Sequence, residues 1–149
     1  MLQRVRDKLV SGPIAKVYDR TKSQTSFWER FAVFAVGPLA LLVVAVLPET
    51  TIEAWTLHID APSLQEAYLT NFVHGGVAHL SNNLIYYVFL MAVLLPLAVF
   101  ADWKREFYVT SFFFMTVVPL IVSYYTVWTL QGTGVETAVG FSGVIAAYL

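Results

Sequence analysis

The sequence contains no cysteine and few charged residues, and both absences limit what the protein can do. Without cysteine it cannot form disulfides, use a thiol nucleophile or bind metals through thiolates. Charged residues make up 13% of the 149 residues, against roughly a quarter in an average soluble domain. Hydrophobic residues make up 58%, and the mean hydropathy is +0.66. The formal net charge of −1 gives no reason to expect nucleic-acid binding. This composition indicates a membrane protein.

Three apolar segments are long enough to cross the roughly 30 Å hydrocarbon core of a bilayer as helices. They run from about residue 28 to 47, from 79 to 100 and from 107 to 130. Each contains one proline, which a membrane helix tolerates because neighbouring groups satisfy the freed backbone. A fourth apolar run begins at Ser142 but is too short to cross a bilayer before the sequence ends. We therefore expect an all-α polytopic membrane protein with three full transmembrane helices and the start of a fourth, in a chain truncated inside that helix.

Basic residues are missing from the two loops that we expect on the outer side. Lys104 and Arg105 lie between the second and third spans, and all other lysines and arginines lie at or before Arg30. The 48–78 and 131–139 loops carry only acidic charges. By the positive-inside rule, these positions predict a multi-pass protein of the cell membrane with a cytoplasmic N-terminus.

Residues 1–27 form the basic lead, and residues 28–149 form the membrane domain. In the lead, Leu2, Val5 and Leu9 recur at helical spacing, and Gly12-Pro13 ends the pattern. This spacing fits either an amphipathic helix lying on anionic lipid or a solvated positive flank that only fixes topology. In the outer loop, Ser63 and Glu66 have the spacing of a capping box and predict a short helix from about residue 64 to 72.

Two groups of residues could carry chemistry. His79 and Asn83 lie four positions apart, on one face near the outer start of the second span. Polar residues inside a membrane often mark function, although this pair could equally cap the helix or bond across helices. Gly140-Phe141-Ser142-Gly143 opens the fourth helix, where a serine between glycines is exposed beside free N–H groups. A glycine-containing helix start that only permits close packing is the structural alternative.

Topology brings these two groups to the same depth below the outer surface, as acyl-transfer chemistry would require. Gly143 and Ala147 also form a small-xxx-small pair, which favours close approach of another helix. We expect that helix to lie outside this sequence.

From about Trp28 to its end, the chain resembles the rhomboid family of intramembrane serine proteases. The resemblance rests on "FVHGGVAHLSNN", which holds His74, His79 and Asn83, followed one span later by "GFSG". It implies a rhomboid-like helical bundle in which Ser142 is the nucleophile that attacks a peptide bond of a transmembrane protein substrate. It also implies that His79, Asn83 and the N–H of Ser142 bind the oxyanion.

The resemblance also implies that His74, Gly75 and Gly76 shape the turn into the second helix. In the same way, it makes Gly140 and Gly143 part of the motif around the serine. In the family the general base is a histidine on the sixth helix, which this sequence does not reach. Serine is a weak nucleophile without an adjacent base, so we expect these residues alone to be inactive. The outer loop also lacks the family's Trp-Arg pair and has Glu66 and Ala67 in that neighbourhood.

Two other functions remain open from the sequence. The first is a rhomboid-like pseudoprotease that binds or escorts membrane clients without cutting them. The second is an unrelated transporter or scaffold that uses His79 and Asn83, although this would leave Ser142 between glycines unexplained. We expect no cofactor and no metal, because His74 and His79 are five apart across two glycines and have no carboxylate beside them. The partners we expect are the lipid bilayer and transmembrane protein substrates.

Overall fold

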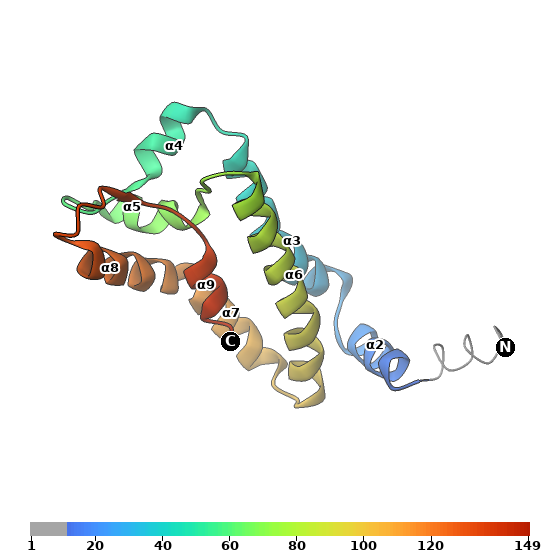
Figure 1. Ribbon diagram of the computed structural model, residues 1–149. Coiled ribbons are helices and arrows are strands. Elements are labelled where there is room, and N and C mark those ends of the chain that lie inside the picture. Colours follow the sequence, from blue (N-terminus) through green and yellow to red (C-terminus); the bar gives the residue numbers. More distant parts are fainter. Residues whose placement is uncertain (1–11) are drawn as a thin grey trace.

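Two long helices form the centre of the molecule and lie side by side (Figure 1). In the computed structural model of the chain, which describes residues 12–149, they are α3 (Phe27–Ala45) and α6 (Val77–Phe100). Both are long and apolar enough to cross a membrane. A capping box starts α3, with the Ser26 side chain accepting from the Glu29 N–H and the Glu29 carboxylate accepting from the Ser26 N–H. The protein is thus mainly helical and has the character of a membrane protein.

The third apolar segment is broken, although the sequence suggests a single span. Helices α7 (Lys104–Thr116) and α8 (Val118–Leu130) meet at Val117 and are bent by 42° relative to each other. Pro119 explains the position of the break, because its ring disfavours helical backbone before it and it has no N–H to donate. If the bent pair is one span, the described residues contain three spans in all.

The outer loop between α3 and α6 is mostly structured. It contains α4 (Glu49–Trp55), β1 (Leu57–His58), α5 (Leu64–Leu69) and the 3₁₀ turn η1 (Thr70–Phe72). The capping box of Ser63 and Glu66 is present, so the predicted short helix is confirmed. Helix α4 was not predicted.

The last part of the chain returns to this loop. Strand β2 (Thr137–Ala138) pairs antiparallel with β1, with Leu57 opposite Ala138. This two-residue pairing is a small exception to the all-α expectation. Helix α9 (Ser142–Ala146) then begins at the predicted serine. A Cβ on Gly143 would lie 2.5 Å from Val122 Cγ1, so the close helix neighbour of Gly143 is α8, and the expectation of a neighbour outside this sequence was wrong.

A helix also occupies the basic lead, at a position the sequence did not suggest. Helix α2 (Pro13–Gln24) has Gly12 as N-cap and packs against α6. Gly12-Pro13 therefore begins a helix instead of ending one, because proline fits the first helical position, where no N–H partner is needed. The Leu2–Leu9 pattern lies outside the described residues.

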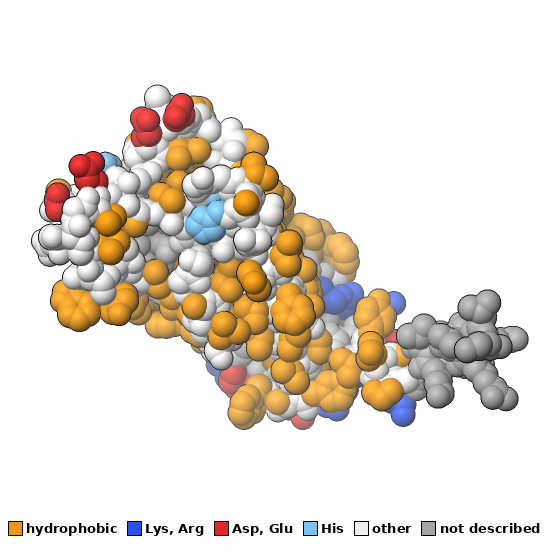
Figure 2. Space-filling view, viewed as in Figure 1, with side chains coloured by type: hydrophobic (Ala, Val, Ile, Leu, Met, Phe, Trp, Pro, Cys, Tyr) orange, Lys and Arg blue, Asp and Glu red, His pale blue; other side chains and the backbone are white. Residues whose placement is uncertain are grey.

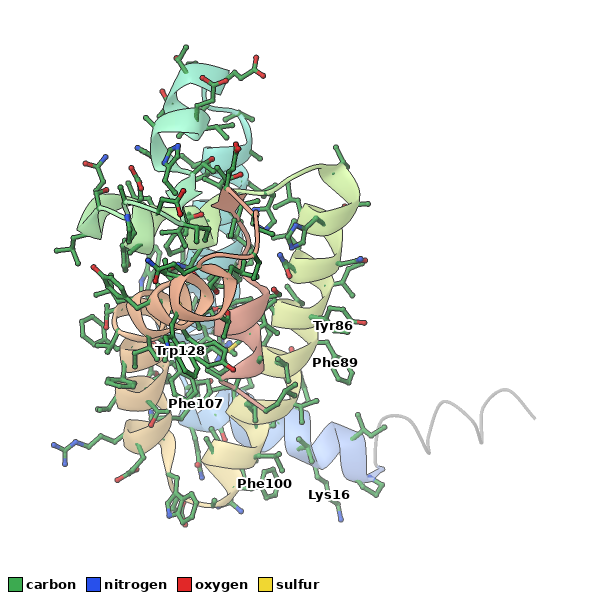
Figure 3. All side chains as sticks on the ribbon, turned by 60° about the vertical axis from the view of Figure 1, so that its left-hand side comes forward. Lys16, Tyr86, Phe89, Phe100, Phe107 and Trp128 are labelled. Carbon is green, nitrogen blue, oxygen red and sulfur yellow. The ribbon has the colours of Figure 1, made fainter. Side chains whose placement is uncertain are left out.

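The core runs through the bundle, and the two ends of the molecule differ in their charged side chains. The most deeply buried large side chains include Leu41, Met91, Leu95, Val99 and Phe141. At the end that carries α4 and α5 the charged side chains are acidic, whereas the α2 end carries the lysines and arginines together with further acidic side chains (Figure 2). The surface between the two ends is largely apolar, and Tyr86 and Phe89 project outward from α6 (Figure 3).

Candidate functional site around Ser142

The structure brings His79 against the segment that holds Ser142. A Cβ added to Gly140 would lie 2.6 Å from Cε1 of the His79 ring, so only glycine leaves room for the imidazole. Gly140 also has a φ of +132°, a conformation that side chains strongly disfavour. The first glycine of the Gly-Phe-Ser-Gly motif is thus required both by its backbone and by its contact with α6.

Phe141 anchors the motif from the other side. Its side chain is fully buried, and its ring centroid lies 5.6 Å from that of Phe72 and 6.3 Å from that of Tyr87. Tyr87 in turn donates a hydrogen bond to the carbonyl of Val33 (2.9 Å), close to Gly37, where a Cβ would come within 2.8 Å of the tyrosine ring. The aromatic packing therefore fixes the start of α9 to both central helices.

Thr70 holds the strand that leads into the motif. Its hydroxyl donates to the carbonyl of Ala138 (2.7 Å) and accepts from the N–H of Leu57 (3.2 Å), while its own carbonyl accepts from the N–H of Gly140 (3.1 Å). Three separate segments therefore meet at one nearly buried threonine.

Asn71 joins the outer loop to the break between α7 and α8. Its side chain is 1% exposed, and its amide nitrogen lies 3.1 Å from the carbonyl of Pro119 and 3.0 Å from Oγ of Ser123. It also lies 3.0 Å from the carbonyl of Ala67 one turn earlier. Both Pro119 and Ser123 lie in the first turns of α8, so the amide ties the outer loop to the start of this helix. The helix carbonyl that Pro119 leaves without a donor is that of Met115, and it accepts a hydrogen bond from the hydroxyl of Tyr68 (3.1 Å).

Ser142 is exposed and lines a pocket of about 270 Å³. The lining includes the polar side chains of Thr70, Asn71, Ser123 and Thr126 together with Gly140 and Gly143. As the first residues of α9, Ser142 and Gly143 have no acceptor for their N–H groups within that helix. A hydroxyl and backbone donors thus lie at the edge of a mostly polar hollow.

Asn83 is hydrogen-bonded to His74, and no hydrogen bond joins it to Ser142 in the described residues. Its amide nitrogen donates to Nε2 of His74 (2.8 Å), while Nδ1 of His74 donates to the carbonyl of Phe72 (3.0 Å). This pattern makes His74 a neutral imidazole with its proton on Nδ1. Burial lowers the pKa of His74, the bond to Phe72 opposes this, and the nearby His79 ring lowers the pKa further.

None of the three histidines forms a hydrogen bond with Ser142 in the described part of the chain. His58 lies in the outer loop, 3.4 Å from the Glu66 carboxylate, and His74 is engaged as above. His79 lies against Gly140, the first residue of the motif. Among residues 12–149 there is also no group of histidine and acidic side chains suited to a metal ion.

The sequence pattern missed Thr70, Asn71 and Tyr87. Only Tyr87 carries a local signal, because it continues the face of His79 and Asn83 at a further interval of four. Gly75 and Gly76 precede α6 as expected, and Gly76 has a φ of +150° that suits the turn into the helix.

Comparison with known proteins gives the chain no family. No protein-family model, no curated protein and no solved structure matches the chain.

Proposed function

We propose that the chain is part of an intramembrane serine protease of the rhomboid type. The observation that carries this proposal is the fit of Gly140 against the ring of His79, which sets the exposed Ser142 beside α6. A purely structural helix start would not require an imidazole at this glycine.

In this mechanism, Oγ of Ser142 attacks the carbonyl carbon of a substrate peptide bond, and the carbonyl oxygen becomes an oxyanion. The N–H groups at the start of α9 and the side chains of His79 and Asn83 stabilise that charge. Asn83 now donates to His74, so its amide must turn when a substrate binds. The proton of Ser142 passes to a general-base histidine that is not one of the three in this sequence.

The substrate is a transmembrane protein, because the serine lies on a helix within an apolar bundle. Basic residues near α2 and acidic ones near α4 and α5 favour a cytoplasmic N-terminus in the cell membrane, with cleavage near the outer face. The pocket of about 270 Å³ beside Ser142 could accept a substrate side chain.

A fluorophosphonate probe tests the nucleophile directly in membranes from cells that express the natural gene. We expect the probe to label the protein and Ser142→Ala to abolish both labelling and cleavage of a transmembrane reporter. Ser81→Ala, a change to another serine near the outer end of α6, is the matched control and should leave labelling unchanged. Equal labelling of the wild-type and Ser142→Ala proteins would refute the proposal.

The second candidate is a rhomboid-like pseudoprotease that binds membrane clients. It is favoured by a groove of about 360 Å³ between α3, α6 and α7, which is lined mainly by apolar side chains. This function predicts that a transmembrane client co-purifies equally with the wild-type and Ser142→Ala proteins, and that neither protein reacts with the probe.

A further inference from the structure

A separate pocket lies at the α2 end of the molecule, away from Ser142. It has a volume of about 310 Å³ and lies between α2, the first turns of α3 and the last turns of α6. Its walls include Val17, Phe34, Leu95 and Pro96, whereas Lys22 and Arg30 add positive charge to the lining. An apolar interior with two cations suits a molecule that has both a hydrocarbon chain and an anionic group.

The helix that covers this pocket has the features of one that lies in a membrane interface. Ile14 and Tyr18 lie one turn apart on α2, and their side chains are 80% and 62% exposed. Lys16 projects from the same helix, at the end of the molecule where Phe100 closes α6 (Figure 3). An apolar face beside lysines and arginines is typical of helices that rest between headgroups and acyl chains.

The basic side chains at this end of the molecule differ in the contacts that they make within the protein. Arg30 is held in place through Nη1, which donates to the carbonyl of Lys22 (3.2 Å) and to the Thr25 side chain (3.0 Å), whereas its Nη2 makes no hydrogen bond or ion pair within the described residues. Arg20 pairs with Asp102 at 3.6 Å. Within the described residues, Lys22 has no carboxylate partner, and its ammonium lies 5.9 Å from the centre of the Tyr18 ring. The face of the Tyr18 ring attracts this ammonium but accepts none of its N–H groups as a carboxylate would, so Lys22 can still bind an external anion.

We propose that this pocket binds one anionic phospholipid from the leaflet on the α2 side. Part of an acyl chain lies against Leu95 and Phe34, and Lys22 and Arg30 bind the phosphate. The lipid then joins α2 to both central helices, where the apolar surface would otherwise lack a partner. This proposal does not depend on whether Ser142 is a nucleophile.

Native mass spectrometry of the full chain, released from nanodiscs with equal phosphatidylglycerol and phosphatidylcholine, tests this site. We expect one phosphatidylglycerol to be retained in preference to phosphatidylcholine. Lys22→Ala should weaken its retention about fivefold, as expected for the loss of one basic residue near an anionic lipid. Arg105→Ala, which removes a charge on α7 outside the pocket, should change retention less than twofold. Equal retention of both lipids, or an equal effect of the two variants, would overturn the proposal.

A second variant separates the pocket from general attraction to an anionic surface. Ala92 lies in the pocket lining, so Ala92→Trp fills the space without changing the charge. We expect it to abolish selective retention, and glycerol phosphate, which has no acyl chain, should not displace the lipid from the wild-type protein. Unchanged retention in Ala92→Trp, or displacement by glycerol phosphate, would show that the apolar interior is not the binding site.

Discussion

At the end that carries α4 and α5, buried neutral hydrogen bonds join distant segments, whereas at the α2 end exposed ion pairs do so. Asn71 and Thr70, which are 1% and 4% exposed, join the outer loop to α8 and to the strand before Ser142. At the other end, Lys104 lies 3.0 Å from Glu29 and Arg20 lies 3.6 Å from Asp102, all with substantially exposed side chains. Buried hydrogen bonds are costly to break, while exposed ion pairs contribute little. The candidate site thus lies at the end whose connecting contacts cost more to break.

Gly140→Ala should have the largest effect on stability, because it adds a side chain at the close contact between Gly140 and His79. The new Cβ would meet the ring of His79, and the φ of +132° would be strained for alanine. Together we expect a loss of about 3 kcal/mol in the free energy of unfolding. The measurement is denaturant unfolding in detergent micelles.

Gly75→Ala is the matched control for this change. No atom lies within 4 Å of its added Cβ, and Gly75 does not have a positive φ. The free energy of unfolding should therefore change by less than about 0.5 kcal/mol. Similar losses of unfolding free energy in the two alanine variants would mean that the contact between Gly140 and His79 does not limit the residue at position 140.

Asn71→Leu should have the second largest effect. Leucine fills nearly the same volume but cannot donate to the carbonyl of Pro119 or to Ser123, so it isolates the hydrogen bonds from any cavity. We expect a loss of about 1–3 kcal/mol, measured by the same unfolding experiment. Asn82→Leu, an exposed asparagine on α6, should stay within about 0.5 kcal/mol of the wild type. An Asn71→Leu protein as stable as the Asn82→Leu protein would mean that the amide does not join the two segments.

The sequence predicts much of the fold where structure depends on local pattern. The long helices lie close to the predicted apolar segments, and the capping box of Ser63 and Glu66 starts a short helix as expected. Helix α9 begins at Ser142, as its glycine-rich approach suggested. In each case the signal lies within a few residues of the element that it predicts.

The features that the sequence did not predict depend mostly on contacts between distant segments. Nothing near Asn71 indicates that it will meet Pro119, and nothing near Thr70 indicates that it will hold Ala138. The helix α2 was missed for a different reason, because Gly-Pro can either end a helix or begin one. The role of Asn83 stays a prediction, since its amide donates to His74 in this structure.

The third prediction concerns pH and tests whether the neutral form of His74 stabilises the folded protein. Because burial lowers the pKa of His74, the unfolded chain takes up a proton at a higher pH than the folded chain. The free energy of unfolding should therefore fall as the pH drops below about 6.5, where an unfolded histidine titrates. Protonation also adds a hydrogen to Nε2, which then cannot accept from Asn83.

Unfolding measured between pH 7.5 and pH 5.5 checks this prediction, with His74→Gln as the non-titrating control. Desolvation raises the pKa of Glu66, but hydrogen bonds from the N–H groups of His58 and Ser63 outweigh it and keep that pKa below its usual 4.5. Glu66 therefore stays ionised throughout this window. Equal pH slopes for the wild type and His74→Gln would show that His74 does not contribute.

The smallest effect is expected at the α2 end. Lys104→Met removes the ion pair with Glu29 and the bond from the ammonium to the carbonyl of Gln24 (2.8 Å), but keeps most of the apolar stem. Since both side chains are about a third exposed, the loss should be only about 0.2–1 kcal/mol. It should shrink in 1 M salt, where the screening length falls to about 3 Å. Arg105→Met, which changes the neighbouring charge without breaking this pair, should have no measurable effect. A loss at Lys104 as large as that at Asn71, and insensitive to salt, would mean that the contacts at both ends are comparably strong and that the buried hydrogen bonds give the end with Ser142 no advantage in stability.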